Sequence, residues 1–538
     1  MKETSNAIYS SLKQHEGIIV VLFLGFVMRS YLAPWRSYWY DELLSVFYYG
    51  TYHETVLAAL QFLAENSVHP PLYQFVLYNW MHFFGDSELA TRSLSNVYIV
   101  GATLFLYLLA YRVFGRRVAF GSALLFTLMY FPMRYGIEAR SYAQTLFLAC
   151  LSSWLLFLFV TKLPKPCGLK ELVVNRRFVW LMLANTGLIT THYYNVFFLG
   201  AQGLFFLVYV LTRRPRFGPI VEIGKIAVVS LTPVAMLLLI WGSAMAHRYS
   251  KSETKGGYYT SFPSADPWTI FVDYVLTPTF QGTSFSKWVP FAAAAALLAL
   301  SLQLAWNAYC WGRRGASERD CFALYFLIWA FVPCLMAFLL FVVAHAERYN
   351  ARYFIFCSPP LAVIVVIALE GVVRFIDRGA WRFEGIKPAR HYVRYALIYA
   401  IVATMVISVP GGWRAASTVK EDYRGIAKMV VNVISGDREH TYIVYEASRG
   451  LDFYLTRISS GGTRVSNYIS RSDESAGRYA FEKHADEIRK HDFLIVAFTH
   501  RRFERFPKSA KRLRELYDMH FKLLDRNGKG IVVYSVGK

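Results

Sequence analysis

The chain has 538 residues, of which 55% are hydrophobic, 17% aromatic and only 17% charged. Soluble domains carry about 25% charged residues, so this composition excludes an ordinary soluble protein. The formal net charge is +22, and in a membrane protein such an excess reflects topology and contact with lipid surfaces. A nucleic-acid partner is a poor explanation of this charge.

Long apolar runs predict membrane-spanning helices, because a helix needs about 20 apolar residues to cross the hydrocarbon core. The chain is therefore predicted to be an α-helical polytopic membrane protein with about 11 transmembrane helices. Two neighbouring runs are separated only by a short break at Thr190–Tyr194. The predicted spans are 17–33, 93–111, 118–133, 142–161, 178–191, 194–211, 226–246, 289–310, 322–344, 353–373 and 395–410.

The distribution of Lys and Arg predicts the topology. These residues are more numerous in the segments on the same side of the membrane as the N-terminus than in the loops on the opposite side. By the positive-inside rule, this places the N-terminus in the cytoplasm and the tail outside. All six cysteines lie in predicted spans or inner segments, and the chain has no Asn-x-Ser/Thr sequon. Both facts favour a prokaryotic inner membrane, with no disulfide framework outside. The first apolar run lacks a small-residue cleavage site, so it is predicted to be a retained span.

Two domains are predicted, a membrane module at 1–410 and an extracytoplasmic domain at 411–538. The module has two long outer loops. The first, 34–92, contains helical patterns at 51–64 and 72–84 that are typical of amphipathic helices on a membrane surface. The second, 247–288, is rich in Tyr, Ser, Thr and Pro, a composition typical of mobile lids.

The tail shows the pattern of a soluble α/β domain. Short runs of β-branched and aromatic residues predict buried strands, and Asn527-Gly528 predicts a hairpin. Strands that alternate with helices favour a partly parallel sheet. No GxGxxG follows a strand, so dinucleotide binding is not expected. The predicted elements are a capping box at 418–421, helices at 426–434, 475–490 and 509–519, strands at 441–445 and 493–498, and a hairpin of 521–524 with 531–535.

Asp41 and Glu42 form an acidic pair just beyond the first apolar run, behind the aromatic stretch 35–39. Acidic side chains are unfavourable near a bilayer and usually mark function there. A carboxylate at such a boundary suits the role of general base. The alternative is a solvated loop start with no chemical role.

His69 precedes two prolines in the same loop. One interpretation is a helix break, because proline rigidifies turns. The other is that His69 faces the same cavity as Asp41 and contacts substrate. A divalent metal site made from Asp41, Glu42 and His69 is a further alternative, since such ligands suit divalent cations.

Several arginines lie where a lipid phosphate could bind. Arg29 falls within the first apolar run, where an anionic partner is needed. Arg348 and Arg352 are four residues apart, so a helix would place them on one face. Guanidinium groups match phosphate oxygens. The alternative for Arg348 and Arg352 is a snorkelling pair, whose aliphatic stems lie in the apolar region while the charged groups reach the membrane surface.

Two further motifs lie at the outer ends of predicted spans. Glu138, Arg140 and Tyr142 form the first, and an ion pair within the loop is its alternative explanation. His192 and Tyr193 lie in the second, where an aromatic membrane belt is the default and contact with substrate the alternative. The sequence has no Walker A motif, Asp-x-Asp, HExxH, GxSxG or CxxC. Nucleotide-driven transport, metal-dependent transfer from nucleotide sugars and zinc or serine hydrolysis therefore lose support.

On these residues the chain resembles the polytopic GT-C glycosyltransferases of the protein O-mannosyltransferase and aminoarabinose–lipid A transferase type. The resemblance covers nearly the whole chain and is most specific in the first 150 residues. Tyr423 departs from the family pattern, in which Trp is commoner. The residues that carry the resemblance are Arg29, Tyr40-Asp41-Glu42, His69–Tyr73, Trp80, Phe84-Gly85, Ser87-Glu88, Arg92, Glu138–Tyr142, Thr191–Tyr194, Arg352-Tyr353, Pro359-Pro360 and Glu421–Gly425.

The resemblance implies transfer of a sugar from a polyprenyl-phosphate-linked donor on the outer face of the membrane. Asp41 would take the proton of the acceptor hydroxyl, with inversion at the sugar carbon, and Glu42 would assist. Substrate would be bound by His69, Glu138, Tyr142, His192 and Tyr193, and the donor phosphate by Arg29, Arg140, Arg348 and Arg352. No nucleotide and no obligatory metal is implied.

Two other classes of protein compete with this interpretation. A transporter or lipid flippase could use Asp41 and Glu42 for proton coupling, although transporters typically show paired halves and broken helices at the midplane. A scaffold without activity is a third class. The acceptor could be a glycolipid, an envelope glycan or a protein, and the sequence identifies neither it nor the sugar.

Overall fold

The structure is a computed structural model in which two compact units can be described. The first unit comprises 1–31, 60–80 and 92–416, and the second comprises 32–59, 81–91 and 417–538. Two pieces of the first predicted outer loop thus belong with the tail. The described residues are 2–67, 69–162, 168–212, 219–252, 318–344, 351–378, 422–434, 441–445, 450–459, 468–470, 493–499, 520–527 and 531–537.

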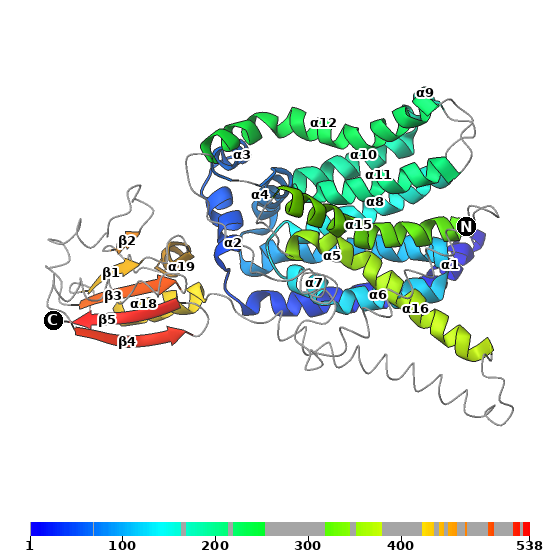
Figure 1. Ribbon diagram of the computed structural model, residues 1–538. Coiled ribbons are helices and arrows are strands. Elements are labelled where there is room, and N and C mark those ends of the chain that lie inside the picture. The colour runs from blue at the N-terminus through cyan, green and yellow to red at the C-terminus, as the bar shows by residue number, and fades with distance from the viewer. Residues whose placement is uncertain are drawn as a thin grey trace. The chain divides into compact units, whose positions relative to one another are not determined.

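The first unit is a bundle of long helices (Figure 1). Within it α8 packs against α10, α11 against α15, and α6 against α16. The helices that lie wholly or largely in this unit are α1 (Lys2–Leu32), α3 (Val56–Asn66), α4 (Leu72–Phe84), α5 (Glu88–Phe114), α6 (Arg116–Leu128), α7 (Tyr130–Tyr135), α8 (Tyr142–Thr161), α9 (Leu169–Val173), α10 (Arg176–Thr191), α11 (Asn195–Thr212), α12 (Pro219–Ser252), α15 (Glu318–Ala344), η3 (Ala351–Cys357) and α16 (Ser358–Arg378).

Six helices among the described residues are long and apolar enough to cross a membrane, and the protein is a membrane protein. They match predicted spans closely: α8, for example, has the bounds predicted from its apolar run. The predicted spans 289–310 and 395–410 lie outside the described residues. The six helices are His15–Trp35, Glu88–Phe114, Tyr142–Thr161, Gly224–His247, Arg319–Ala337 and Arg352–Gly371.

The prediction of one continuous span at 118–133 is wrong. The chain leaves the helix at Met129, whose ψ is 150°, and α7 begins at the next residue. Pro132 explains the break, because in a continuous helix its ring would clash with the carbonyl of Leu128. In the first turn of a new helix the missing N–H of proline is harmless.

The break predicted between 178–191 and 194–211 is present, and α10 and α11 are separate helices. The second predicted outer loop begins later than expected, because α12 continues to Ser252. The rest of that loop lies outside the described residues.

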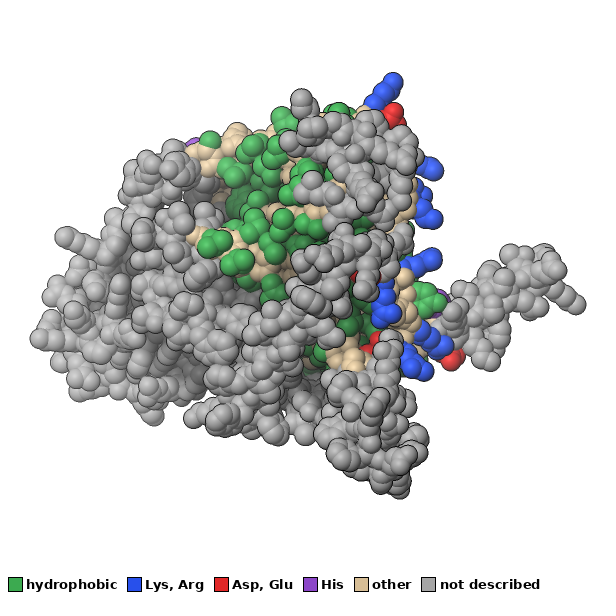
Figure 2. Space-filling view, turned by 45° about the vertical axis from the view of Figure 1, so that its right-hand side comes forward, with side chains coloured by type: hydrophobic (Ala, Val, Ile, Leu, Met, Phe, Trp, Pro, Cys, Tyr) green, Lys and Arg blue, Asp and Glu red, His purple; other side chains and the backbone are tan. Residues whose placement is uncertain are grey.

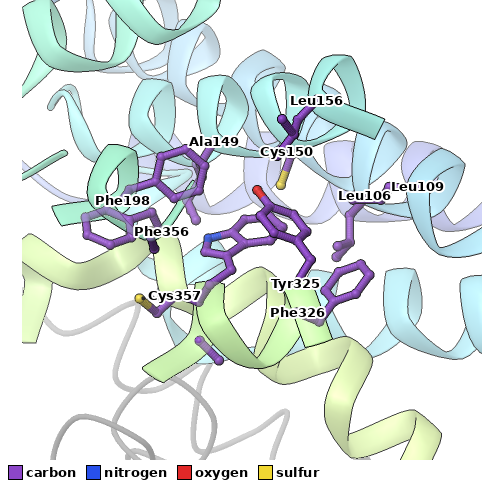
Figure 3. Close-up of a cluster of buried hydrophobic side chains, with 14 of the residues drawn as sticks. Leu106, Leu109, Ala149, Cys150, Leu156, Phe198, Tyr325, Phe326, Phe356 and Cys357 are labelled. Carbon is purple, nitrogen blue, oxygen red and sulfur yellow. Dashed lines mark hydrogen bonds between the residues drawn. The ribbon is translucent and has the colours of Figure 1, made fainter. Parts of the chain in front are cut away.

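Aromatic and aliphatic side chains fill the core of the bundle (Figure 3). Tyr325 and Phe326 of α15 lie among side chains from α5, α8, α11 and η3. Trp329, one turn further along α15, is completely buried and stacks on Phe326 with ring centroids 6.0 Å apart. Phe198 meets Trp329 edge-on at 5.6 Å, the geometry that aromatic pairs prefer.

A buried polar network crosses this apolar core. Asn185 of α10 donates to Gln202 of α11 at 3.0 Å, and its carbonyl accepts from Ser152 of α8. Gln202 donates in turn to Ser152 at 2.8 Å and to the Tyr325 hydroxyl at 3.3 Å. Tyr325 also pairs with Ser153 at 2.8 Å. Four helices are therefore joined by side-chain hydrogen bonds between buried residues.

The second unit contains a five-stranded sheet in the order β2-β1-β3-β5-β4. β1 pairs with β2 and β3 in parallel, and β5 pairs with β3 and β4 antiparallel. Strands therefore occur where they were predicted, at 441–445, from 493 and in the hairpin. The elements are η1 (Ala33–Trp35), α2 (Tyr40–Leu43), η2 (Leu44–Thr51), α18 (Tyr423–Ile434), α19 (Gly450–Ser459), β1 (Thr441–Tyr445), β2 (Tyr468–Ser470), β3 (Phe493–Thr499), β4 (His520–Asn527) and β5 (Ile531–Gly537).

The sequence did not predict α19, β2 or η2. The predicted helices at 475–490 and 509–519 and the capping box at 418–421 lie outside the described residues. Helix α18 begins with a local cap, in which the Asp422 carboxylate accepts the N–H of Gly425 at 3.0 Å. This is the usual use of Asp at a helix start.

Candidate active site

Asp41 lies in α2, a single helical turn that begins after the extended residue Trp39. The Trp39 N–H donates to the carboxylate of Glu42 at 3.3 Å, so Glu42 satisfies a backbone donor at the start of its own helix. Glu42 is completely buried, whereas Asp41 is half-buried. The structure thus gives Glu42 a local structural task and leaves Asp41 the more accessible of the two carboxylates.

A π-helix, η2, follows α2 directly at Leu44–Thr51. Ser45 at its start donates to the carbonyl of Asp41 at 3.4 Å. π-Helices are rare and occur frequently at functional sites. The backbone around Asp41 is therefore unusual on its C-terminal side.

In the first unit, four residues predicted as site residues come together from four separate segments. Nη2 of Arg140 lies 3.4 Å from Nε2 of His69. The rings of His69 and His192 are 5.9 Å apart. The guanidinium of Arg352 acts on both histidines electrostatically.

Tyrosine rings line the same cluster. The Arg352 guanidinium carbon lies 5.8 Å from the centroid of the Tyr142 ring and 5.6 Å from that of Tyr353. The His192 ring is 6.1 Å from Tyr142 and 5.2 Å from Tyr353. Aromatic faces stabilise a guanidinium, so Tyr142 and Tyr353 help to place Arg352 beside the histidines. Tyr194 packs against Tyr353 in a tilted arrangement, with ring centroids 4.7 Å apart.

The electrostatics of this cluster favour an anion. Burial, and then the charges of Arg140, His192 and Arg352, lower the pKa of the His69 imidazole well below its ordinary value. Burial, and then Arg140 and Arg352, lower the pKa of His192 to about 3. Both imidazoles are therefore neutral at pH 7, while the guanidinium groups stay charged. An anion bound here would gain from two fixed positive charges in a poorly solvated place.

Glu138 pairs with Arg134 at 2.8 Å, and both side chains are buried. Its carbonyl accepts from the Ser95 hydroxyl at 2.6 Å and from the N–H of Arg140 at 2.9 Å. Burial, and then the charge of Glu138, raise the pKa of Tyr135 well above its ordinary value. The ion pair predicted as the alternative explanation of this motif is present, with Arg134 as the partner. It fixes the backbone that carries Arg140.

Arg29 is completely buried, and its Nε donates to Asn96 of α5 at 2.7 Å. Asn96 donates in turn to Ser30 and to the carbonyl of Phe26. A Cβ at Gly136 would lie 2.5 Å from Cδ of Arg29, so glycine is needed for this packing. Arg29 thus ties α1 to α5.

Tyr193 and Arg348 are the remaining predicted site residues. Tyr193 is half-buried next to His192, and burial raises its pKa to about 12. Arg348 lies outside the described residues. Asp41 and Glu42 belong to the second unit and the cationic cluster to the first.

Sequence analysis did not assign Tyr353, Tyr194 or Tyr135 to the site. Tyr353 and Tyr194 were named only among the residues that carry the family resemblance, and that was the available signal. Tyr135 packs on Tyr142 with ring centroids 4.7 Å apart, and nothing in the sequence marks it.

No metal site can be built from the described residues, since none of their His, Cys, Asp and Glu side chains form a group of three or more that could hold an ion. The histidines of the cationic cluster, His69 and His192, stand beside two guanidinium groups that would repel a cation. The alternative site of Asp41, Glu42 and His69 would draw on both compact units.

Residues 68–241 match the family model described as dolichyl-phosphate-mannose-protein mannosyltransferase. The matched segment includes His69, Arg140 and His192. No curated protein sequence matches the chain. Two solved structures of ArnT from Cupriavidus metallidurans share its fold. The predicted resemblance to GT-C proteins is confirmed at the level of the fold.

The ArnT structure described as bound to undecaprenyl phosphate aligns with 97% of this chain and 98% of its own, at 14% identity and a TM-score of 0.50. The apo structure aligns with 96% and 97%, at 13% identity and a TM-score of 0.53. An oligosaccharyltransferase from Archaeoglobus fulgidus aligns with 98% of this chain and 74% of its own, at 13% identity and a TM-score of 0.48. At such identities, likeness to the ArnT structures establishes the GT-C fold.

Proposed function

We propose that the protein is a membrane glycosyltransferase that moves a sugar from a polyprenyl-phosphate-linked donor to an acceptor on the outer face of the membrane. The acceptor belongs to the envelope glycolipids, polysaccharides or proteins. The observation that carries the proposal is the cluster of Arg140 and Arg352 with two neutral histidines. It is an anion site in a membrane protein whose fold is shared with a structure bound to a lipid phosphate.

In the proposed reaction the acceptor hydroxyl oxygen attacks the anomeric carbon of the donor sugar. Asp41 takes the hydroxyl proton, and the bond between the carbon and the phosphate oxygen breaks. Polyprenyl phosphate leaves with the electron pair, and the configuration at the carbon is inverted. Arg140 and Arg352 stabilise the negative charge that grows on the leaving phosphate, which is the largest single contribution in many enzymes.

The other predicted residues support these steps. His69, Tyr142, His192 and Tyr193 contact the substrate around the phosphate, and Glu138 holds the segment of Arg140 in place. A neutral imidazole can still donate one hydrogen bond to a phosphate oxygen. Predicted donor-phosphate contacts of Arg29 and Arg348 remain part of the proposal, as does a catalytic contribution of Glu42.

The same proposal includes the location. The protein lies in the cell inner membrane with its N-terminus in the cytoplasm, and the α/β domain at 411–538 lies outside. No metal is required in this proposal, because the departing phosphate is stabilised by arginine. A proton-coupled transporter is disfavoured, since the matching family model carries the name of a transferase.

The test is Asp41→Asn, assayed with lipid-linked sugars extracted from bacterial membranes and the envelope fraction as acceptor. Transfer is expected to fall at least 100-fold, because general-base catalysis contributes about 10²–10⁴-fold. Glu54→Gln is the matched control: it neutralises an exposed carboxylate of the same loop and should retain wild-type transfer. Wild-type turnover in Asp41→Asn, at equal abundance in the membrane, would overturn the assignment of the base.

A further inference from the structure

A hydrogen bond joins the tail to the backbone that leads into α2. The N–H of Tyr38, three residues before Asp41, donates to the hydroxyl of Tyr454 in α19 at 2.8 Å. Tyr38 is completely buried, and Tyr454 is 5% exposed. Both residues belong to the second unit. A contact between residues 416 positions apart therefore reaches the start of the segment that carries the proposed base.

The Tyr454 hydroxyl has a second partner that fixes its direction. It donates to Oε1 of Glu88 at 2.7 Å. Burial, and then the charge of Glu88, raise the pKa of Tyr454 far above its ordinary value, so the group keeps its proton. With its single hydrogen directed at Glu88, the oxygen presents a lone pair to the Tyr38 N–H.

Two arginines of the tail also contact the segments of the first outer loop that lie in the second unit. Arg424 of α18 pairs with Glu88 at 3.3 Å and donates to the carbonyl of Pro34 at 3.1 Å. Arg457 of α19 pairs with Asp86. Helices α18 and α19 are thereby bound to both described pieces of the first outer loop in this unit, 32–59 and 81–91. Glu88 takes part in contacts with both helices.

Aromatic packing secures both sides of α2. The Phe453 ring of α19 meets Tyr38 edge-on with centroids 5.7 Å apart, and Phe47 of η2 edge-on at 5.5 Å. Phe453 is 2% exposed. The hydroxyl of Tyr38 in turn donates to the carbonyl of Asp86 at 2.9 Å. The segment before Asp41 and the segment after it thus touch the same residue of the tail.

We infer that Tyr454 is a positioning residue for catalysis, whose hydroxyl orients α2 and with it the carboxylate of Asp41. The inference rests on the proposed function of Asp41. A displacement of about 1 Å in a reacting group can lower a rate by about 100-fold. Loss of one hydroxyl should therefore slow the chemical step, while donor binding, which we assign to the other unit, stays as it is.

The experiment compares Tyr454→Phe with Tyr209→Phe in the full-length protein in detergent. Each variant removes one buried tyrosine hydroxyl, and that of Tyr209 donates to the carbonyl of Val160 within the bundle. Tyr454→Phe is expected to lower kcat about tenfold with donor KM within twofold of wild type. Tyr209→Phe is expected to leave both parameters unchanged, and the two variants should unfold at similar temperatures.

A second pair of variants covers the case in which Tyr454→Phe folds poorly. Glu88→Gln keeps an acceptor for the Tyr454 hydroxyl, whereas Glu88→Ala removes it. The inference expects Glu88→Ala to lower kcat selectively and Glu88→Gln to retain most of it, since the half-exposed ion pair with Arg424 contributes little. A stability effect alone would lower the unfolding temperature without this split between kcat and KM.

Asp41→Asn in the same assay separates two kinds of failure. An inactive Asp41→Asn together with full kcat in Tyr454→Phe and Glu88→Ala would overturn the positioning role alone. An active Asp41→Asn would overturn the proposed base itself. Parallel changes in kcat and donor KM in Tyr454→Phe would also contradict the inference.

Discussion

His192 is buried and uncharged near the guanidinium groups of Arg140 and Arg352, and this has a consequence for stability. The pKa of histidine is 6.5 in an open chain, and burial together with Arg140 and Arg352 lowers that of His192 to about 3. Between these values the unfolded chain binds more protons than the folded one, so stability falls as the pH falls. For one histidine the slope is at most about 1.4 kcal/mol per pH unit.

We predict that His192→Gln flattens the dependence of thermal stability on pH. Between pH 6.5 and 4.5 the unfolding midpoint of the ligand-free wild type should decline more steeply than that of His192→Gln. Differential scanning fluorimetry in detergent measures both. His82→Gln, which changes an exposed histidine, should follow the wild-type slope. Parallel curves for His192→Gln and wild type would contradict the buried, neutral state.

Arg352 is predicted to contribute to donor affinity. Charge-assisted hydrogen bonds are worth about 1.5–3 kcal/mol, so Arg352→Ala should raise donor KM by about 10–100-fold. The control is Arg319→Ala, which removes an exposed arginine that lies over Phe114 and should leave donor KM unchanged. An unchanged donor KM in Arg352→Ala would remove this residue from the phosphate site.

At the scale of the elements, the polar network joins α8, α10, α11 and α15 through buried side chains. Gln202 takes part in three hydrogen bonds of this network, with Asn185, Ser152 and Tyr325. Interhelical hydrogen bonds in membranes contribute on average about 0.6 kcal/mol each. Removal of a central member has a larger effect, because buried partners lose an acceptor or a donor.

We therefore predict that Gln202→Leu lowers the free energy of unfolding by about 1–3 kcal/mol, measured by titration with sodium dodecyl sulfate. Thr103→Val is the matched control, because the buried Thr103 hydroxyl donates only within its own helix, to Ile99 at 2.9 Å. Its effect should be well under half as large. Equal effects would mean that the network does not join the helices.

Elements with regular apolar patterns could be predicted from the sequence, and irregular ones could not. Helix α8 has its predicted bounds because its polar ends delimit one apolar run. Helix α19 begins with glycine and mixes Asp452 and Arg457 with aromatic residues, a composition that does not by itself mark a helix. The π-helix Leu44–Thr51 cannot be distinguished from an aromatic loop, because its i→i+5 bonding leaves no pattern in composition.

Within the site, the sequence identified residue types and not their pairings. His69, Arg140, His192 and Arg352 were expected to serve one substrate, and the structure brings them together. Arg29, also expected at the phosphate, donates to Asn96, a pairing that the sequence did not predict. Such pairings depend on which helices pack together, and a single sequence holds no record of that contact.

At the scale of the whole chain, the surface charges of the helical unit are segregated. Figure 2 shows Lys and Arg side chains along one edge, beside a broad hydrophobic surface. Exposed basic residues flank the turns between α5 and α6 and between α8 and α10, namely Arg112, Arg116, Arg117, Lys162, Lys170, Arg176 and Arg177. The positive-inside rule assigns these turns to the cytoplasm.

Labelling of single cysteines tests this orientation. In a variant without the six natural cysteines, Glu54→Cys should react with a membrane-impermeant maleimide in intact spheroplasts. Lys170→Cys should react only after the membrane is opened. Both residues are exposed, so access to the reagent alone decides the outcome. The reverse pattern would invert the proposed topology.

The contact between Tyr38 and Tyr454 also sets an order of events during synthesis. In the proposed topology, Tyr38 emerges outside long before its partner, because 416 residues separate the two. At about 5–20 residues per second this interval is roughly 20–80 s. During that time the segment that carries Asp41 lacks its contacts with α19. A nascent or prematurely terminated chain would thus carry a misplaced base, so that activity begins only when translation is nearly complete.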